Sequence, residues 1–343
     1  YVWGHRYYTG AQHRRTFAFN NGLIYNIDDN GTEASLTAGP FNVSAIPCSE
    51  VMRVSSNDIL FFSEGVNTGM WSYDGNLGNV FAKEAAVTLN FVGMLAHLDR
   101  LWGFAEDSES LYFSKNLVPT NFTDSTDAGS IIIGPRNGSK IVQILLLHET
   151  IFIFKTDSVW RLSGRTPYEF DVHEVHPSLG CVARRSCVNT RTGIIFLGSD
   201  FEFYGFGGTV DSTIMLSYKV AIAGDPERKV LPVINTTKVD GIVATFHNLV
   251  YRCSFTENGQ TTNNLEWCYD TISETDFFTR GFNISCYIPW RRYPDNNELL
   301  TGRADIGFLM KMYQYLNVDN SAASPFMRIR LITKAVGIDD PRN

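Results

Sequence analysis

The feature that most constrains the fold of this chain is a unit of two short strands that recurs along it. Each unit has a short apolar strand, a polar turn, and a second strand rich in aromatic residues. Apolar segments joined by such turns are typical of antiparallel hairpins. Seven copies are recognisable, at 16–19 with 23–27, 59–62 with 70–73, 100–104 with 110–114, 150–154 with 158–162, 193–197 with 201–206, 249–253 with 264–269, and 298–302 with 308–315.

The spacing of these units predicts a β-propeller. Successive units begin 43, 41, 50, 43, 56 and 49 residues apart, and a four-stranded propeller blade takes about 40–50 residues. Four of the units follow an apolar segment that supplies a further strand, at 45–54, 91–98, 139–147 and 186–190. We therefore expect an all-β chain that forms a propeller of six or seven blades.

The propeller is expected over residues 1–320, with 321–343 as a closing strand that leads into a further C-terminal region. Segments 115–140 and 207–240 are rich in Pro, Asn, Gly and Thr and are predicted to be exposed loops. A short amphipathic helix is possible at Met215–Ala223. The alternative fold is a pair of β-sandwich domains, because sandwiches also show strands at intervals of about 8–12 residues.

The amino-acid composition argues against several classes of function. Aromatic residues make up 13% of the chain, which favours strands. The formal net charge of −7 and the lack of a Lys/Arg stripe argue against a basic nucleic-acid binder. The longest apolar runs have the length of a strand, far below the roughly 20 residues of a spanning helix, so no membrane-spanning segment is expected.

Six cysteines spread over a chain of this length are better explained as buried free thiols than as a disulfide framework. Cys253 and Cys268 flank a turn-rich stretch and are the best candidates for a disulfide across a hairpin. Six Asn-x-Ser/Thr sequons favour secretion weakly, because about half as many would occur by chance. The sequons begin at Asn30, Asn42, Asn121, Asn137, Asn235 and Asn283.

Paired carboxylates are the first catalytic candidates, because propellers can host glycosidases and that reaction needs two acids about 5–9.5 Å apart. Asp200 and Glu202 lie on a turn and the strand after it. A second group lies in one predicted hairpin, and it contains Asp99, Glu106, Asp107 and Glu109. Acids in hairpin turns are usually solvated, and the Asp-box typical of sialidases is missing. We therefore expect these carboxylates to be solvated and not catalytic.

His173 and His176 bracket Glu174, a spacing that resembles a metal site. Zinc-binding pairs of this kind rely on helical i, i+4 geometry. In an extended strand, residues three apart point to opposite faces, so a shared metal is not expected.

Other motifs are equally weak. No Gly-x-Ser-x-Gly is present, and the glycine-rich 205–208 segment lacks the spacing of a phosphate loop and is predicted to end a hairpin. The doublets Arg184–Arg185 and Arg291–Arg292 could contact phosphate or a neighbouring subunit, although solvated surface is the simpler interpretation. We predict no catalytic, cofactor-binding or metal-ligating residues, and hence no cofactor.

The stretch 163–208 resembles the tail nozzle proteins of short-tailed bacteriophages, also called tail tubular protein B-like or packaged-DNA-stabilisation proteins. The similar elements are a strand ending in Trp160-Arg161-Leu162, a loop with Pro167, Gly180-Cys181, Ser186-Cys187-Val188, and a turn at Ser199-Asp200. Segments 99–122 and 329–343 also resemble the corresponding parts of these tail proteins. Phe201 departs from the family pattern, because the family favours Gly at that turn position.

The resemblance implies a structural virion protein without catalytic activity, located in the phage tail. It implies copies arranged in a ring, expected to be six-fold, that extends the portal and adaptor and contacts other tail proteins. Double-stranded DNA would pass transiently and non-specifically through the exit channel during DNA ejection. An acidic lumen would suit that passage, because it repels phosphates.

Two other functions stay open. A secreted, carbohydrate-active propeller is mildly favoured by the sequons and by the even cysteine count. A receptor-binding or scaffold propeller would work through one face with aromatic anchors. The best cluster for that role is Trp290, Arg291, Arg292 and Tyr293.

Overall fold

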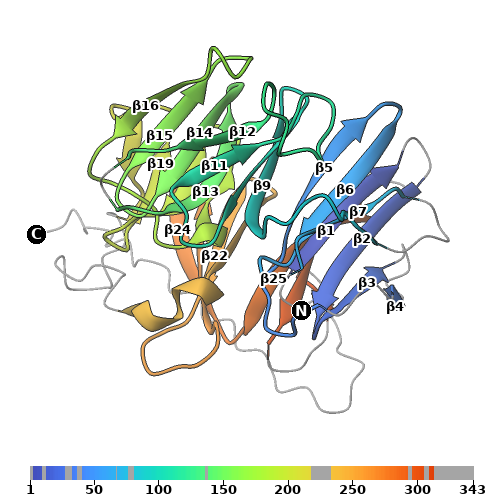
Figure 1. The fold of residues 1–343 in the computed structure, drawn as a ribbon. Coiled ribbons are helices and arrows are strands. Elements are labelled where there is room, and N and C mark those ends of the chain that lie inside the picture. Colours follow the sequence, from blue (N-terminus) through green and yellow to red (C-terminus); the bar gives the residue numbers. More distant parts are fainter. Residues whose placement is uncertain are drawn as a thin grey trace, which may run out of the picture.

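The computed structural model describes seven antiparallel sheets that follow one another along the chain (Figure 1). Six sheets have four strands and the last has three. In every sheet the strands lie in chain order, so each is a simple meander. The described residues are 3–9, 13–27, 33–36, 41–66, 68–75, 81–135, 138–217, 233–292, 296–304 and 309–312.

The first three blades account for the N-terminal part of the chain. Blade 1 contains β1 (Trp3–Thr9), β2 (His13–Asn20), β3 (Leu23–Ile27) and β4 (Glu33–Leu36). Blade 2 contains β5 (Cys48–Val54), β6 (Asn57–Ser63), β7 (Met70–Tyr73) and β8 (Ala82–Lys83). Blade 3 contains β9 (Phe91–His97), β10 (Arg100–Ala105), β11 (Ser110–Phe113) and β12 (Gly129–Ile132).

Blades 4 and 5 form the middle of the chain. Blade 4 contains β13 (Ile141–Leu147), β14 (Thr150–Lys155), β15 (Val159–Ser163) and β16 (Asp171–His176). The 3-10 helix η1 (Arg184–Ser186) precedes blade 5. Blade 5 contains β17 (Val188–Asn189), β18 (Ile194–Leu197), β19 (Phe203–Phe206) and β20 (Thr213–Met215).

Blades 6 and 7 complete the described chain. The 3-10 segment η4 (Thr236–Gly241) leads into blade 6. Blade 6 contains β21 (Val243–His247), β22 (Val250–Phe255), β23 (Leu265–Asp270) and β24 (Thr275–Arg280). Blade 7 contains β25 (Ile284–Arg292), β26 (Asn296–Arg303) and β27 (Leu309–Lys311).

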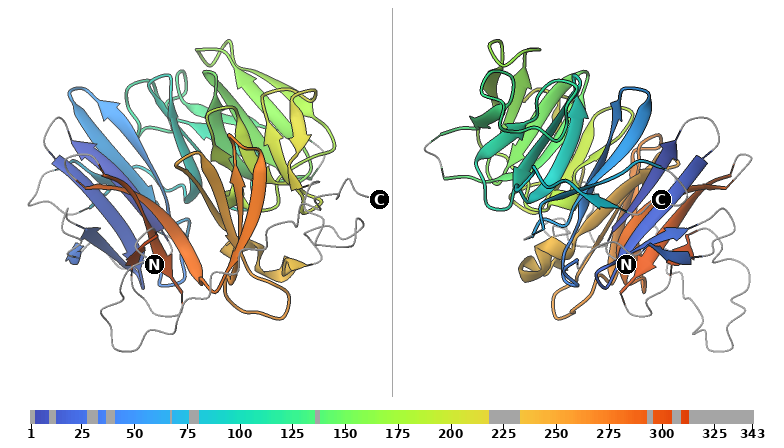
Figure 2. Two further views of the ribbon diagram at one scale, coloured as in Figure 1. Left: turned by 180° about the vertical axis from the view of Figure 1, so that it is seen from behind. Right: turned by 45° about the vertical axis from the view of Figure 1, so that its right-hand side comes forward.

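The first strand of each blade faces the centre of a closed ring. β5 contacts β9, β9 contacts β13, β13 contacts β17, β17 contacts β21, β21 contacts β25, and β25 contacts β1, which in turn contacts β5. Figure 2 shows the last sheet, in orange and red, beside the first, in blue. Apolar side chains seal this junction, among them Ala18, Ile27, Cys286 and Ile288. The chain is therefore a seven-bladed propeller, and the alternative of two β-sandwiches is wrong.

The seven predicted hairpins are confirmed as the second and third strands of their blades, from β2–β3 to β26–β27. In the seventh, the structure describes Leu309–Lys311 as a strand, whereas 308 and 313–315 lie outside the described residues. The four additional strands are confirmed as β5, β9, β13 and β17. The expected loops are wrong in part, because 115–140 contains β12 and 207–240 contains β20. Met215 ends strand β20 rather than starting a helix, and 218–223 lies outside the described residues, as does 321–343.

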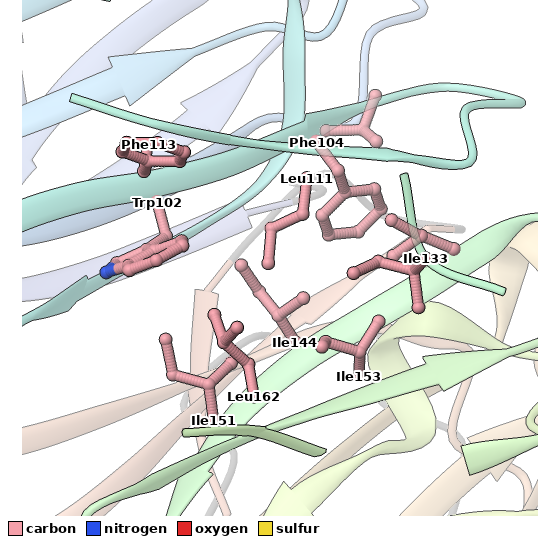
Figure 3. Close-up of a cluster of buried hydrophobic side chains, with 11 residues drawn as sticks. Trp102, Phe104, Leu111, Phe113, Ile133, Ile144, Ile151, Ile153 and Leu162 are labelled. Atoms are coloured by element: carbon pink, nitrogen blue, oxygen red, sulfur yellow. The ribbon is translucent and has the colours of Figure 1, made fainter. Parts of the chain in front are cut away.

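The hydrophobic core lies between the blades. Figure 3 shows Leu111 of blade 3 directed toward Ile144 and Leu162 of blade 4. Between blades 5 and 6, the rings of Phe203 and Trp267 are stacked with centroids 4.1 Å apart. Each such large apolar side chain contributes about 1.5–3 kcal/mol when it is fully buried, so the interfaces hold most of the folding free energy that apolar burial supplies.

Two glycines let aromatic rings lie flat on blade 3. A Cβ atom at Gly103 would lie 2.6 Å from Cδ1 of Phe91, and one at Gly93 would lie 2.3 Å from Cε1 of Phe104. Both distances are far below van der Waals contact, and both rings are fully buried. A side chain at either position would therefore displace a ring from the core.

We predict that Gly103→Ala lowers the free energy of unfolding by about 1–3 kcal/mol, because the added methyl overpacks the core against Phe91. Urea unfolding followed by tryptophan fluorescence measures this change. The matched control is Gly205→Ala, also within a strand, where the new Cβ would meet its nearest atom, on Leu216, at 3.6 Å. Equal effects of the two substitutions would contradict this account of the packing.

Candidate functional site: the axial cavity

A cavity of about 370 Å³ lies at the end of the ring where the inner strands β5, β9, β13, β17 and β21 begin. Its wall is assembled from chain segments that belong to different blades, because the ends of the inner strands and the turns beside them converge there. The contributing segments are 44–46 and 64–66 near blade 2, Val92 and 106–107 of blade 3, 140–142 at the start of blade 4, Arg184 and Arg185 of η1, and Val239 and Asp240 of η4.

Arg184 reaches from η1 to blade 3. Its Nη1 donates to the Val92 carbonyl at 3.4 Å, and its Nη2 donates to the Glu106 carboxylate. Its guanidinium lies 5.9 Å from the centroid of the Phe104 ring. In return, Gln143 of blade 4 donates from Nε2 to the Arg184 carbonyl at 3.3 Å. One arginine therefore links three blades next to the axis.

Arg185 reaches the opposite way. Its Nη2 donates to the Asp240 carbonyl at 2.9 Å, and its Nη1 donates to the Ser285 carbonyl at 3.4 Å. Burial lowers the pKa of this guanidinium to about 10. The Arg184–Arg185 doublet is consequently not solvated surface, as the sequence suggested, but a pair of braces across the centre of the propeller. Trp290, Arg291 and Arg292 belong to β25, but their side chains are outside the description, and Tyr293 lies outside the described residues.

The charges around the cavity are mixed. Glu64 is 2% exposed and accepts the backbone N–H of Asn42. Lys140 pairs with Glu109, at 3.7 Å between Nζ and Oε1. Four acids and three bases line the wall, so the cavity presents no field of a single sign.

The structure separates the acids that the sequence grouped together. Asp99 lies in the turn before β10, whereas Glu106 and Asp107 lie in the turn after it. A strand of six residues puts these two turns about 20 Å apart. Glu106 and Glu109 are each engaged with a base, Arg184 and Lys140 respectively. Asp99 is therefore separated from the other three acids, and two of those three are paired with bases.

Asp200 and Glu202 have structural partners in blade 5. The Tyr204 hydroxyl donates to Oδ2 of Asp200 at 2.6 Å, and the Glu202 N–H donates to Oδ1 of Asp200 at 3.1 Å. Glu202 is 2% exposed and accepts the Ser217 hydroxyl. The neighbouring residue Phe201 has φ = 63°, a left-handed backbone for which glycine is the natural choice, as the family pattern suggested.

The two histidines lie on β16, the outermost strand of blade 4. A register shift adds one residue to β16, so that His173 pairs with Arg161 and His176 pairs with Val159. Both therefore stand on one face of the sheet, and the expected opposite orientation is wrong because of the bulge. His173 is engaged with Asp171 at 2.6 Å. No group of three potential ligands assembles in the described part of the chain.

The structure also tests the disulfide predicted between Cys253 and Cys268 and the hairpin end predicted at 205–208. Cys253 pairs with Trp267, and Cys268 pairs with Arg252, so the two cysteines point to opposite faces of the sheet. All six thiols are free, and Cys253–Cys268 is not a disulfide. The glycine-rich 205–208 segment ends β19 and begins the turn to β20, as predicted.

Glu50 on β5 was missed by the sequence reasoning. Burial raises its pKa to about 7, against the opposing effect of hydrogen bonds from the backbone N–H groups of Ala96 and Val51. A carboxyl with such a pKa can serve as an acid catalyst. Glu50, however, faces β9 between blades 2 and 3 and does not line the axial cavity. The protonation state of Glu50 therefore affects the packing between blades 2 and 3.

Comparison with known proteins supports the fold. No protein-family model matches the chain, and no curated protein matches it. A streptogramin B lyase is similar in structure, with a TM-score of 0.51 and 12% identity over 86% of this chain and 89% of the other. The virginiamycin B lyase from Staphylococcus aureus has a TM-score of 0.47 and 11% identity over 87% and 90% of the two chains. At 12% identity, the likeness to the streptogramin B lyase shows the fold alone. Among the described residues, no helix has the length and apolar character needed to cross a membrane.

We predict that Arg184→Ala lowers the free energy of unfolding by about 1–3 kcal/mol, because it removes hydrogen bonds to Val92 and Glu106 at a blade junction. The urea midpoint at constant m-value measures this loss. Arg165→Ala is the control, since Arg165 is exposed, and it should change stability by less than about 0.5 kcal/mol. Similar losses in both variants would argue against a bracing role for Arg184.

Glu50 should make stability depend on pH. Because its pKa is raised in the folded state, the native protein binds more protons than the unfolded chain between about pH 4.5 and pH 7. Stability should therefore fall by about 1–3 kcal/mol as the pH rises through this interval. Glu50→Gln should remove that part of the slope in urea titrations at several pH values, whereas the exposed-site variant Glu169→Gln should keep it.

Proposed function

We propose that this chain is a structural subunit of a bacteriophage tail, a nozzle or hub protein through which DNA leaves the particle. The proposal combines the sequence resemblance at 163–208 with the propeller fold. That stretch runs from β15 through η1 to the turn after β19, so it includes both bracing arginines. In this role the propeller acts as a rigid block that assembles with copies of itself, not as a catalyst.

The main observation behind the proposal is how the charged side chains at the axial cavity are hydrogen-bonded. The propeller axis is a common place for a ligand site, and its strongest ligand-binding groups here are Arg184 and Arg185. Both guanidiniums instead bind carbonyls or carboxylates of other blades. Arginines engaged in this way stiffen the ring, and stiffness is what a building block of a channel requires.

Charge is compatible with the passage of DNA. The chain carries a net charge of −7, and exposed acids occur on several blades, including Asp107, Glu174 and Asp211. Surfaces of this kind do not attract phosphates, because binding to duplex DNA depends on basic groups that displace its counterions. A duplex could therefore slide past such a subunit.

The alternative of a secreted, carbohydrate-active propeller receives less support. It needs a pair of converging carboxylates, whereas the carboxylates of Glu106, Glu109, Asp200 and Glu202 each have a partner within the fold. The sequon residue Asn235 accepts the Thr237 N–H with its amide oxygen and donates from Nδ2 to the Gln260 carbonyl at 3.2 Å. Its amide is thus already used within the fold.

The proposal predicts that the chain is a component of mature virions of the phage that encodes it. Mass spectrometry of gradient-purified particles should detect it together with the major capsid protein, which serves as the loading control. Cryo-electron microscopy should place it in a symmetric ring, expected to be six-fold, below the portal. Particles that contain capsid and portal proteins but lack this chain would overturn the proposal.

A further inference from the structure

Two cysteines next to the arginine braces are already in contact. The Sγ atoms of Cys181 and Cys187 are 3.3 Å apart, and the Cys187 thiol donates to the Cys181 sulfur. Their exposed fractions are 0% and 6%. A disulfide has an S–S length of about 2.0 Å, so an approach of about 1.3 Å would close the bond. No other two of the six cysteines, all of which lie in the described chain, have a comparable sulfur contact.

The backbone holds both cysteines in place. The Cys181 N–H donates to the Lys155 carbonyl at 2.8 Å, and Cys181 forms a β-bridge with Gly198. Cys187 caps the end of η1, where its N–H donates to the Arg184 carbonyl at 3.4 Å. These bonds tie Cys181 to blades 4 and 5 and tie Cys187 to the helix. The two sulfurs therefore meet because the fold positions them.

Ser186, between the two cysteines along η1, reinforces this arrangement. Its hydroxyl donates to the Ala183 carbonyl at 2.7 Å and accepts the Leu197 N–H at 3.0 Å. Its carbonyl accepts the Tyr251 hydroxyl at 2.8 Å. The surrounding side chains are apolar, among them Phe154, Leu179 and Phe196. A disulfide would replace the contact between the two sulfurs and the donation from the Cys181 thiol to the Ala183 carbonyl at 3.3 Å. That carbonyl would keep the hydroxyl and the N–H of Ser186 as donors.

We propose that Cys181 and Cys187 form a disulfide when the protein meets an oxidant such as a peroxide. The two thiols lose two electrons and two protons, and the O–O bond of hydrogen peroxide breaks to give two water molecules. A glutathione-type disulfide would do the same by exchange and would release two thiols. The resulting bond closes a loop that contains η1 and holds Arg184 and Arg185 beside the axial cavity. This inference does not depend on the role in a virion.

The arginines between the cysteines make the test decisive. Trypsin cleaves after Arg184 and Arg185, so residues 166–184 and 186–191 become separate peptides that stay joined only through a disulfide. Full-length protein is treated with hydrogen peroxide or glutathione disulfide, alkylated without reduction, and digested. We expect the joined pair in the oxidised sample only, and a thiol count in denaturant that falls from six to four. A count that stays at six, or a link to a different cysteine, would overturn the proposal.

Thermal stability provides a second readout. Oxidation should raise the melting temperature of the wild-type protein by about 2–5 °C, reversibly with dithiothreitol, because a closed loop constrains the unfolded chain. Cys187→Ser should abolish the rise, whereas Cys253→Ser, at another fully buried thiol, should keep it. A rise that persists in Cys187→Ser would show that the stabilisation comes from other chemistry. Should Cys187→Ser fail to fold, the peptide map of the wild-type protein still decides the question.

Discussion

Burial between blades is the interaction on which this structure depends. A sheet of four short strands has two apolar faces and cannot shield both from water by itself. Packing each sheet against two neighbours solves this problem, but only if the last sheet meets the first. The contact between β25 and β1 is therefore as important as any contact within a blade. The same need to bury apolar surface between blades explains two local features. The rings of Phe203 and Trp267 are stacked, and aromatic rings pack closely over Gly93 and Gly103.

The centre of the ring poses a different problem, because the blades diverge from an axis where polar strand ends meet. Apolar packing cannot fill that space without leaving carbonyl groups unpaired. Arg184 and Arg185 supply several donors each and so satisfy carbonyls from more than one blade. Their long stems lie against the inner strands while their charged ends reach across. The same residues that a ligand site would use thus serve to hold the blades together.

Several of these constraints converge on the segment 180–187. A Cβ at Gly180 would lie 2.3 Å from the Asp157 nitrogen, so a larger residue would push blade 5 away from blade 4. Cys181 then bridges to blade 5, η1 presents the arginines, and Cys187 returns the chain to β17. Close packing at Gly180 and the bridge at Cys181 therefore join blades 4 and 5 within this short segment.

The sequence by itself determined the hairpins, because alternation of apolar residues and turn formation depend on neighbours along the chain. It also limited the blade number to six or seven through the spacing of the hairpins. Outermost strands such as β8 and β12 escaped prediction, because β8 has only two residues, both exposed, and β12 has only four, two of them exposed. The bulge beside His176, the ring closure and the inward position of Arg184 and Arg185 were decided by the tertiary structure alone. Each depends on segments that are far apart in the sequence and meet only when seven sheets stack around one axis.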